Sequence, residues 1–150
     1  DYQVGELIDH VDGNTICEAD HLFATRLWQN NSKVHFDINA REDRKRLIYG
    51  GHIISLVRAL SFNGLENAQL IVGINGGTHA NPAFADDTIY CWSEVLDKID
   101  LNVRNIAALR LRSVGTKEKN HSMKIKSDDG RYLPAIVLDF DYWVLVPKEL

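Results

Sequence analysis

The feature that most constrains the fold is one very apolar helix, which is followed by a long stretch without any further helical pattern. From Gly51 to Phe62, apolar residues fall on nearly every side of the predicted helix. A helix that is apolar all round is normally buried. Asn63-Gly64 is a typical helix end. The rest of the chain must therefore supply the elements that surround this helix.

The segments after this helix are predicted to be strands. The last one is the clearest, because its apolar residues alternate and so share one face. A polar stretch, residues 117–131, predicts a loop before it. The predicted strands are residues 68–75, 88–98, 104–116 and 135–146.

The first third of the chain is predicted to be helical. Thr15, with Glu18 three residues later, has the spacing of a capping box at the start of a helix from about Glu18 to Gln29. A short helix is expected from about Asp37 to Arg44. A helical first third, one buried helix and a run of antiparallel strands predict an α+β domain over residues 1–150, with the sheet wrapped around the central helix.

Composition indicates a globular protein with no affinity for nucleic acid or membrane. The 150 residues are 45% hydrophobic and 25% charged, which suits one domain with one core. The net charge of −4 argues against a nucleic-acid surface. No apolar run approaches the roughly 20 residues of a membrane span, and the first residues do not resemble a signal peptide. Cys17 and Cys91 form no motif, so free thiols in the cytoplasm are expected.

Candidate site residues gather in the stretch from Leu27 to Leu56. Asn30 and His35 are five residues apart, and Gly50-Gly51 opens the apolar helix. A polar dyad that faces a glycine at a helix N-terminus suits acid/base chemistry next to a carbonyl. The alternative is a structural histidine beside a simple glycine turn.

These residues resemble the motifs of the hotdog fold, and more narrowly of the MaoC-like dehydratases and R-specific enoyl-CoA hydratases. That family carries Asp-x-Asn-Pro-x-His, then His-Gly at the central helix, then Pro-x-Phe-x-x-Asp. The chain has Asn30 to His35, Gly50-Gly51, and Pro82 to Asp87 at the three places. The resemblance implies that His35 is the catalytic histidine and that Gly51 supplies an oxyanion site.

The chain departs from the family at Asn30, where the family has a catalytic aspartate. An amide can orient water or substrate, but it cannot take a proton near neutral pH. His35 would then need another acid, for which Asp37 and Glu18 are the candidates nearest in sequence, or else the chemistry has changed.

A closer resemblance covers nearly the whole chain, from ATRLWQNNSKVHFD to VLDFDYWVLVP. It is similar to the C-terminal half of the mesaconyl-CoA (2-methylfumaryl-CoA) hydratases, also called β-methylmalyl-CoA dehydratases, which are double-hotdog proteins. The resemblance implies an acyl-CoA substrate, no cofactor beyond the coenzyme A of that substrate, and a second hotdog from another segment, another chain or a second copy.

Several further residues are candidates for substrate binding or for the core. Gly50, His52, His79 and Arg46 are expected to contact substrate, and Arg46 belongs to a cationic run that could meet a phosphorylated tail. Trp28 and Trp92 are predicted core residues. No set of residues has metal-ligand spacing, and no GxGxxG or P-loop motif is present. Histidines that lie in polar stretches are expected to have no specific role: His10, His21 and His121.

Three functions remain open from the residues and the resemblance. The leading one is a hydro-lyase that adds water across the double bond of an α,β-unsaturated acyl-CoA. The second is an acyl-CoA thioesterase, which also occurs on this fold. The third is a non-catalytic hotdog that completes the coenzyme A site of a partner domain, which Asn30 favours and His35 with Gly51 disfavours.

Overall fold

The computed structural model describes residues 2–68, 70–103, 105–119 and 123–148. Within these residues the chain forms one antiparallel five-stranded sheet in the order β1-β3-β4-β5-β2. The strands are β1 (Leu7–Thr15), β2 (Leu70–Thr78), β3 (Thr88–Val103), β4 (Ile106–Thr116) and β5 (Ile136–Pro147). The helices are α1 (Glu18–Leu27), a 3-10 turn (Lys33–His35), α2 (Gly50–Leu60) and the single turn α3 (Phe62–Leu65).

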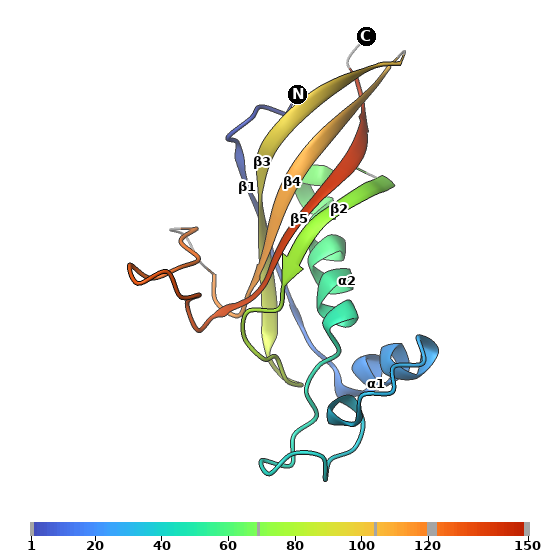
Figure 1. The fold of residues 1–150 in the computed structure, drawn as a ribbon, viewed down its shortest axis with the longest axis vertical. Coiled ribbons are helices and arrows are strands. Elements are labelled where there is room, and N and C mark those ends of the chain that lie inside the picture. Colours follow the sequence, from blue (N-terminus) through green and yellow to red (C-terminus); the bar gives the residue numbers. More distant parts are fainter. Residues whose placement is uncertain (1, 69, 104, 120–122, 149–150) are drawn as a thin grey trace.

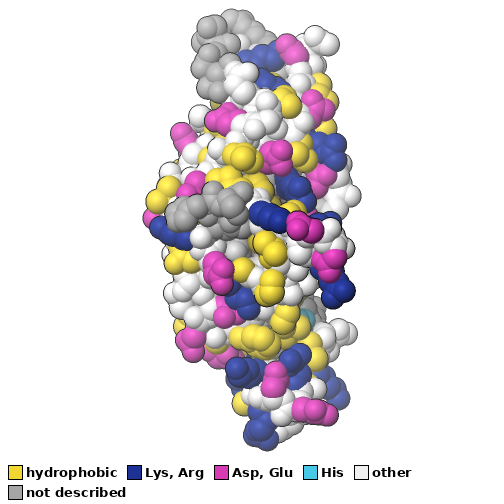
Figure 2. All heavy atoms as spheres, turned by 90° about the vertical axis from the view of Figure 1, so that its left-hand side faces the viewer, with side chains coloured by type: hydrophobic (Ala, Val, Ile, Leu, Met, Phe, Trp, Pro, Cys, Tyr) yellow, Lys and Arg dark blue, Asp and Glu magenta, His cyan; other side chains and the backbone are white. Residues whose placement is uncertain are grey.

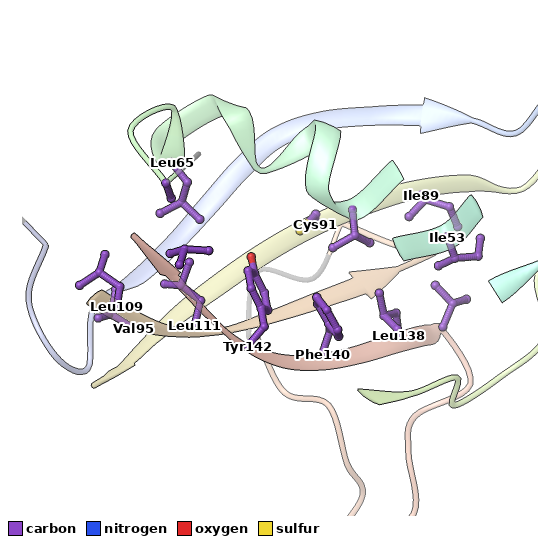
Figure 3. Close-up of a cluster of buried hydrophobic side chains, with 14 of the residues drawn as sticks. Ile53, Leu65, Ile89, Cys91, Val95, Leu109, Leu111, Leu138, Phe140 and Tyr142 are labelled. Atoms are coloured by element: carbon purple, nitrogen blue, oxygen red, sulfur yellow. The ribbon is translucent and has the colours of Figure 1, made fainter. Parts of the chain in front are cut away.

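The helix α2 lies along one face of the curved sheet, as Figure 1 shows, and it contacts β1, β3, β4 and β5. Ile53 and Val57 on α2 are buried in the same core as Leu109, Leu111 and Phe140 from the sheet, part of which is drawn in Figure 3. Burying each such side chain contributes about 1.5–3 kcal/mol. The predicted hotdog architecture, an antiparallel sheet around a central helix, is confirmed.

The prediction that α2 is buried on every side is wrong for this chain alone. Ile53 and Val57 face the sheet and are buried, whereas Ser55 and Ala59 are exposed. The other apolar side chains of α2 are only partly buried. The sheet covers one face of the helix, so the apolar residues on its flanks remain partly accessible.

The first strand was not predicted, because its sequence lacks an apolar alternation. In β1 only His10 is buried. The strand forms because β3 offers a free edge, along which Leu7 pairs with Glu94 and Thr15 pairs with Thr88. The first third of the chain therefore begins with an edge strand and is not wholly helical.

Two local predictions ahead of α2 are also wrong. Thr15 ends β1, and its hydroxyl lies 2.8 Å from that of Thr88, so the residue at the start of α1 is Cys17, without a side-chain cap. Residues 37–44 form turns. Asp37 accepts a hydrogen bond from the N–H of Asn39, and such local bonds compete with helix formation.

The two predicted core tryptophans differ in the structure. Trp92 is buried, as predicted, whereas Trp28 follows the last residue of α1 and is 62% exposed. The described part of the polar stretch before β5, residues 117–119 and 123–131, has no helix or strand, as predicted for a loop, and Lys126 forms an isolated bridge with Tyr132. No helix among the described residues is long and apolar enough to cross a membrane.

A chain of buried polar side chains crosses the core from β1 to α2. It starts at His10, which is fully buried although Asp9 and Asp12 lie close to it in sequence. The side-chain contacts are His10 Nε2 to Ser93 Oγ at 2.8 Å, Ser93 Oγ to Ser113 Oγ at 2.7 Å, Ser113 Oγ to the Tyr142 hydroxyl at 2.9 Å, and Arg58 to the Tyr142 hydroxyl at 3.0 Å. His10 therefore has a specific structural role, contrary to the prediction.

Candidate active site

A cavity of about 500 Å³ opens at the N-terminal end of α2. Its lining brings together residues from the segment after α1, from the start of α2 and from the segment after β2. Five of the seven predicted site residues line it: Asn30, His35, Gly50, Gly51 and His79. Tyr49 and Asn81 also line it and were not predicted.

The start of α2 presents two backbone donors to this cavity. The first helical bonds run from the N–H groups of His52 and Ile53 to the carbonyl of Tyr49, at 2.9 and 3.4 Å. Within the described residues, the N–H groups of Gly50 and Gly51 have no hydrogen-bond partner. Unpaired N–H groups at a helix N-terminus are suited to bind negative charge.

Both glycines are required by the closeness of a neighbouring ring. A Cβ atom at Gly50 would lie 2.5 Å from Nε2 of His79, and one at Gly51 would lie 2.7 Å from the ring of Tyr49. Side chains at these positions would collide with the rings or displace them. Glycine therefore keeps both N–H groups open to the cavity.

His35 is held in one tautomer by its own segment. Its Nδ1 lies 2.8 Å from the carbonyl oxygen of Leu47, and because a carbonyl only accepts, Nδ1 carries the proton in the neutral ring. Nε2 then has the free lone pair. The ring centroid lies 5.9 Å from that of Tyr49. This geometry leaves Nε2 of His35 able to accept a proton.

Asn30 is held by an Asx turn. Its Oδ1 accepts a hydrogen bond from the N–H of Ser32 at 2.9 Å. Its Nδ2 has no partner among the described residues. The amide therefore offers an oriented N–H donor at the cavity, and it has no basic atom.

The described lining of the cavity contains no Asp or Glu. Of the two acids considered from the sequence, Glu18 pairs with Arg46 at 2.7 Å, and Asp37 accepts the N–H of Asn39. Neither Arg46 nor His52 lines the cavity. The titratable groups that do line it are His35, Tyr49 and His79, and burial lowers the pKa of His79.

His21 is a buried histidine beside the site that sequence analysis did not single out. It is fully buried on α1, and its ring centroid lies 6.4 Å from that of His35 and 6.5 Å from that of His52. Neither ring nitrogen has a partner within the described residues. Burial lowers the pKa of His21. The acidic residues before it, Glu18 and Asp20, gave no sign of this position.

The cationic run lies in the segment between α1 and α2, at one end of the molecule. Figure 2 shows Lys and Arg side chains gathered at that end. Arg41 pairs with Asp43 at 2.7 Å, and Arg41 and Lys45 lie 5.5 and 5.6 Å from the ring centre of Phe84. The run is thus partly neutralised.

Among the described residues, no group of three His, Cys, Asp or Glu side chains is placed to hold a metal ion. Cys17 is exposed and Cys91 is buried, and burial raises the pKa of the Cys91 thiol. His121 lies outside the described residues.

The fold and the sequence resemble one class of known protein, the MaoC-like hotdog dehydratases. A crystal structure of a MaoC domain dehydratase from Chloroflexus aurantiacus matches 100% of this chain and 44% of its own, with 54% identity and a TM-score of 0.95. A Mycobacterium tuberculosis protein with a double hotdog fold matches at 15% identity and a TM-score of 0.72, which supports the fold alone. No family model matches the chain.

At the level of sequence, the chain is similar to part of two curated enzymes. It is 60% identical to mesaconyl-CoA hydratase of Cereibacter sphaeroides and 57% identical to β-methylmalyl-CoA dehydratase of Chloroflexus aurantiacus, over 99% of this chain in each case. The chain spans only 43% and 44% of their lengths. The resemblance stated from the motifs is confirmed, whereas its assignment to the C-terminal half stays a prediction.

Proposed function

We propose that this chain is a hotdog of a hydro-lyase that adds water to the double bond of an α,β-unsaturated acyl-CoA. One observation carries the proposal: two kinds of group line the same cavity. They are Nε2 of His35, which is free to accept a proton, and the unpaired N–H groups of Gly50 and Gly51. A base and an oxyanion site that converge on one cavity are the parts that hydration of a thioester-activated alkene needs.

In the forward direction, His35 takes a proton from water as the water oxygen bonds to the β-carbon of the substrate. Negative charge develops on the thioester oxygen, which accepts hydrogen bonds from the start of α2, where the helix dipole stabilises it. The α-carbon then takes this proton from the His35 imidazolium, which completes the addition of one water and restores the neutral base. Asn30 orients water or substrate, since its amide has no basic atom.

For the substrate, we propose mesaconyl-CoA, with β-methylmalyl-CoA as its hydration product. Support comes from the names of the two relatives and from their identity to this chain, 60% and 57%. Coenzyme A enters as part of this substrate, and the absence of a further cofactor stays a prediction. The cytoplasmic location also stays a prediction.

The test is to incubate the purified protein with mesaconyl-CoA and crotonyl-CoA while enoyl absorbance and free thiol are both followed. Loss of the double bond without release of thiol is the expected result. Release of thiol would identify a thioesterase. No change with either substrate would contradict the hydratase proposal and would favour a non-catalytic hotdog.

The non-catalytic hotdog is the second candidate, because the described lining of the cavity has no carboxylate. In that case the protons would be handled by a partner hotdog, and this half would shape the substrate site. His35→Ala separates the two candidates, since it would leave the turnover of the whole assembly unchanged if the chain served only as a scaffold.

We further propose that this hotdog pairs with another through the edge strand β2, the partner being a second hotdog domain or a second copy. As the last strand in the sheet order, β2 exposes apolar side chains, which in a lone sheet would favour aggregation. Exposure is 57% for Leu70, 52% for Val72 and 65% for Ile74. The relatives are more than twice as long as the matched region, which leaves room for a second hotdog.

Light scattering at micromolar concentration should therefore give a mass above that of one hotdog. The substitution Ile74→Lys should weaken the pair, because a charge on a strand edge opposes pairing. A stable monomer of one hotdog would contradict this proposal.

A further inference from the structure

The cavity at the start of α2 combines several hydrogen-bond donors with no described carboxylate. Its lining includes the N–H groups of Gly50 and Gly51, the amide of Asn30 and the ring of His79. The thioester oxygen of the substrate is one anionic group, and the N–H groups at the helix start are enough to bind it. The remaining donors have no acceptor among the described residues.

The Asx turn of Asn30 leaves its Nδ2 protons available to donate into the cavity. Its Oδ1 is already used by the N–H of Ser32 at 2.9 Å, which leaves the two protons of Nδ2 for a ligand. An aspartate could make the same turn with one oxygen, but it would present its second, charged oxygen in the place of Nδ2. The two residue types would therefore select ligands of opposite polarity.

His79 lines the same cavity as this amide and lies against the start of α2. Its ring lies against Gly50, as the 2.5 Å from a Cβ built there to Nε2 shows. Its ring nitrogens have no hydrogen-bond partner within the described part of the chain. An exposed imidazole beside the positive end of a helix is suited to donate to an anion.

We propose that Asn30 and His79 are specificity-determining residues that bind a second carboxylate on the acyl group of the substrate. This inference rests on the proposed hydratase function, whose proposed substrate is a dicarboxylic enoyl-CoA, and it assigns the residues that recognise the second carboxylate. In mesaconyl-CoA the carboxylate is bonded to the carbon that water attacks, so it must lie beside His35. A carboxylate side chain in that place would repel it.

The kinetic test compares kcat/KM for mesaconyl-CoA with kcat/KM for crotonyl-CoA, which lacks the carboxylate, using the protein in its native assembly. Because a hydrogen bond to a charged group contributes about tenfold or more in binding, Asn30→Asp and His79→Ala should each lower this ratio about 10- to 100-fold. His79→Gln, which keeps a donor, should lower it less.

The matched control is Asn31→Asp, which adds the same charge one residue away. Asn31 is exposed and does not line the cavity, so the ratio should stay within about threefold of wild type. Thermal unfolding of each variant identifies any loss of fold. If His79→Ala does not fold, the ratio of kcat/KM values measured for His79→Gln tests the role of His79.

A binding measurement separates this inference from the hydratase proposal, because it needs no turnover. Calorimetry should show that wild type binds succinyl-CoA more tightly than butyryl-CoA, and that Asn30→Asp removes this preference. If neither enoyl-CoA is hydrated but this preference is present, the hydratase proposal fails and the recognition of a carboxylate stands. If the variants lower affinity for both saturated acyl-CoAs equally, or leave the preference unchanged, the inference is overturned.

Discussion

The guanidinium of Arg58, on the central helix, donates a hydrogen bond of 3.0 Å to the hydroxyl of Tyr142, at the middle of β5. Because an arginine can only donate, the Tyr142 proton is free to go to Ser113. Ser113 then donates to Ser93, and Ser93 donates to Nε2 of His10. The Nδ1–H of His10 donates to the carbonyl of Asn63 at 2.6 Å. Every member of the chain has one consistent role when His10 is neutral.

Removing the hydroxyl of Tyr142 should therefore destabilise the fold. Tyr142→Phe leaves a buried serine and a half-buried guanidinium without this partner, which costs about 1–3 kcal/mol in the free energy of unfolding. Urea unfolding measures the loss. Tyr90→Phe is the control, because the Tyr90 hydroxyl has no hydrogen bond within the described residues. An equal effect of the two substitutions would contradict the chain described above.

The stability of the protein should fall below about pH 6.5, the usual pKa of histidine. Burial lowers the pKa of His10 and of His21, so the native state stays neutral at these groups while the unfolded chain takes up protons. The free energy of unfolding then decreases as pH falls, by up to about 1.4 kcal/mol per pH unit for each histidine. This loss ends once pH passes the lowered pKa in the folded state.

His10→Gln should make this decrease shallower, which urea unfolding between about pH 7.5 and pH 5 would measure. His21→Gln tests the second histidine in the same way. A wild-type curve that is flat over this range, or a His10→Gln curve that is as steep as that of wild type, would show that His10 is not a neutral group of the native core.

His35→Asn should separate the structural role of this residue from its chemistry. The amide nitrogen of asparagine can take the place of Nδ1 and donate to the carbonyl of Leu47, but no atom replaces Nε2. Turnover of an enoyl-CoA should fall roughly 10²–10⁴-fold, while the melting temperature stays close to that of wild type. His35→Ala should lose turnover to the same extent and lose stability as well.

At Gly51, the effect of alanine should depend on Tyr49. In the wild-type background, the added methyl group would lie 2.7 Å from the Tyr49 ring, so Gly51→Ala should destabilise the fold by about 1–3 kcal/mol. In a Tyr49→Ala background the collision is gone. The same substitution should then be neutral or slightly stabilising, because alanine favours the helix by up to about 1 kcal/mol. A double-mutant cycle of urea unfolding measures this coupling.

The elements with strong apolar periodicity could be predicted from the sequence. The helix α2 and the strands β3, β4 and β5 were found because their buried side chains follow the period of each structure. Strand β1 was missed because its pairing with β3 is decided by a neighbour distant in sequence. The helix expected at residues 37–44 failed because Asp37 bonds its own backbone.

Of the candidate site, the motif spacing located the residues but not their surroundings. Asn30, His35, Gly50, Gly51 and His79 lie in one cavity. His52 and Arg46 lie close to these residues in sequence but do not line the cavity. Arg46 instead pairs with Glu18, which is 28 residues away in sequence. The burial of His21 beside His35 depends on how α1 packs, which local sequence does not reveal.

The hydrogen bond between His35 and the carbonyl of Leu47 bears on how the site residues could be transferred between related genes. Leu47 also donates its N–H to the carbonyl of Val34 at 2.9 Å, so the base is tied to the residues that lead directly into the two glycines. Asn30, His35, Gly50 and Gly51 all lie within residues 30–51. A single recombination event that exchanged this stretch between two hotdog genes would transfer the base, the amide and both backbone donors together. Only His79 would be left behind with the recipient.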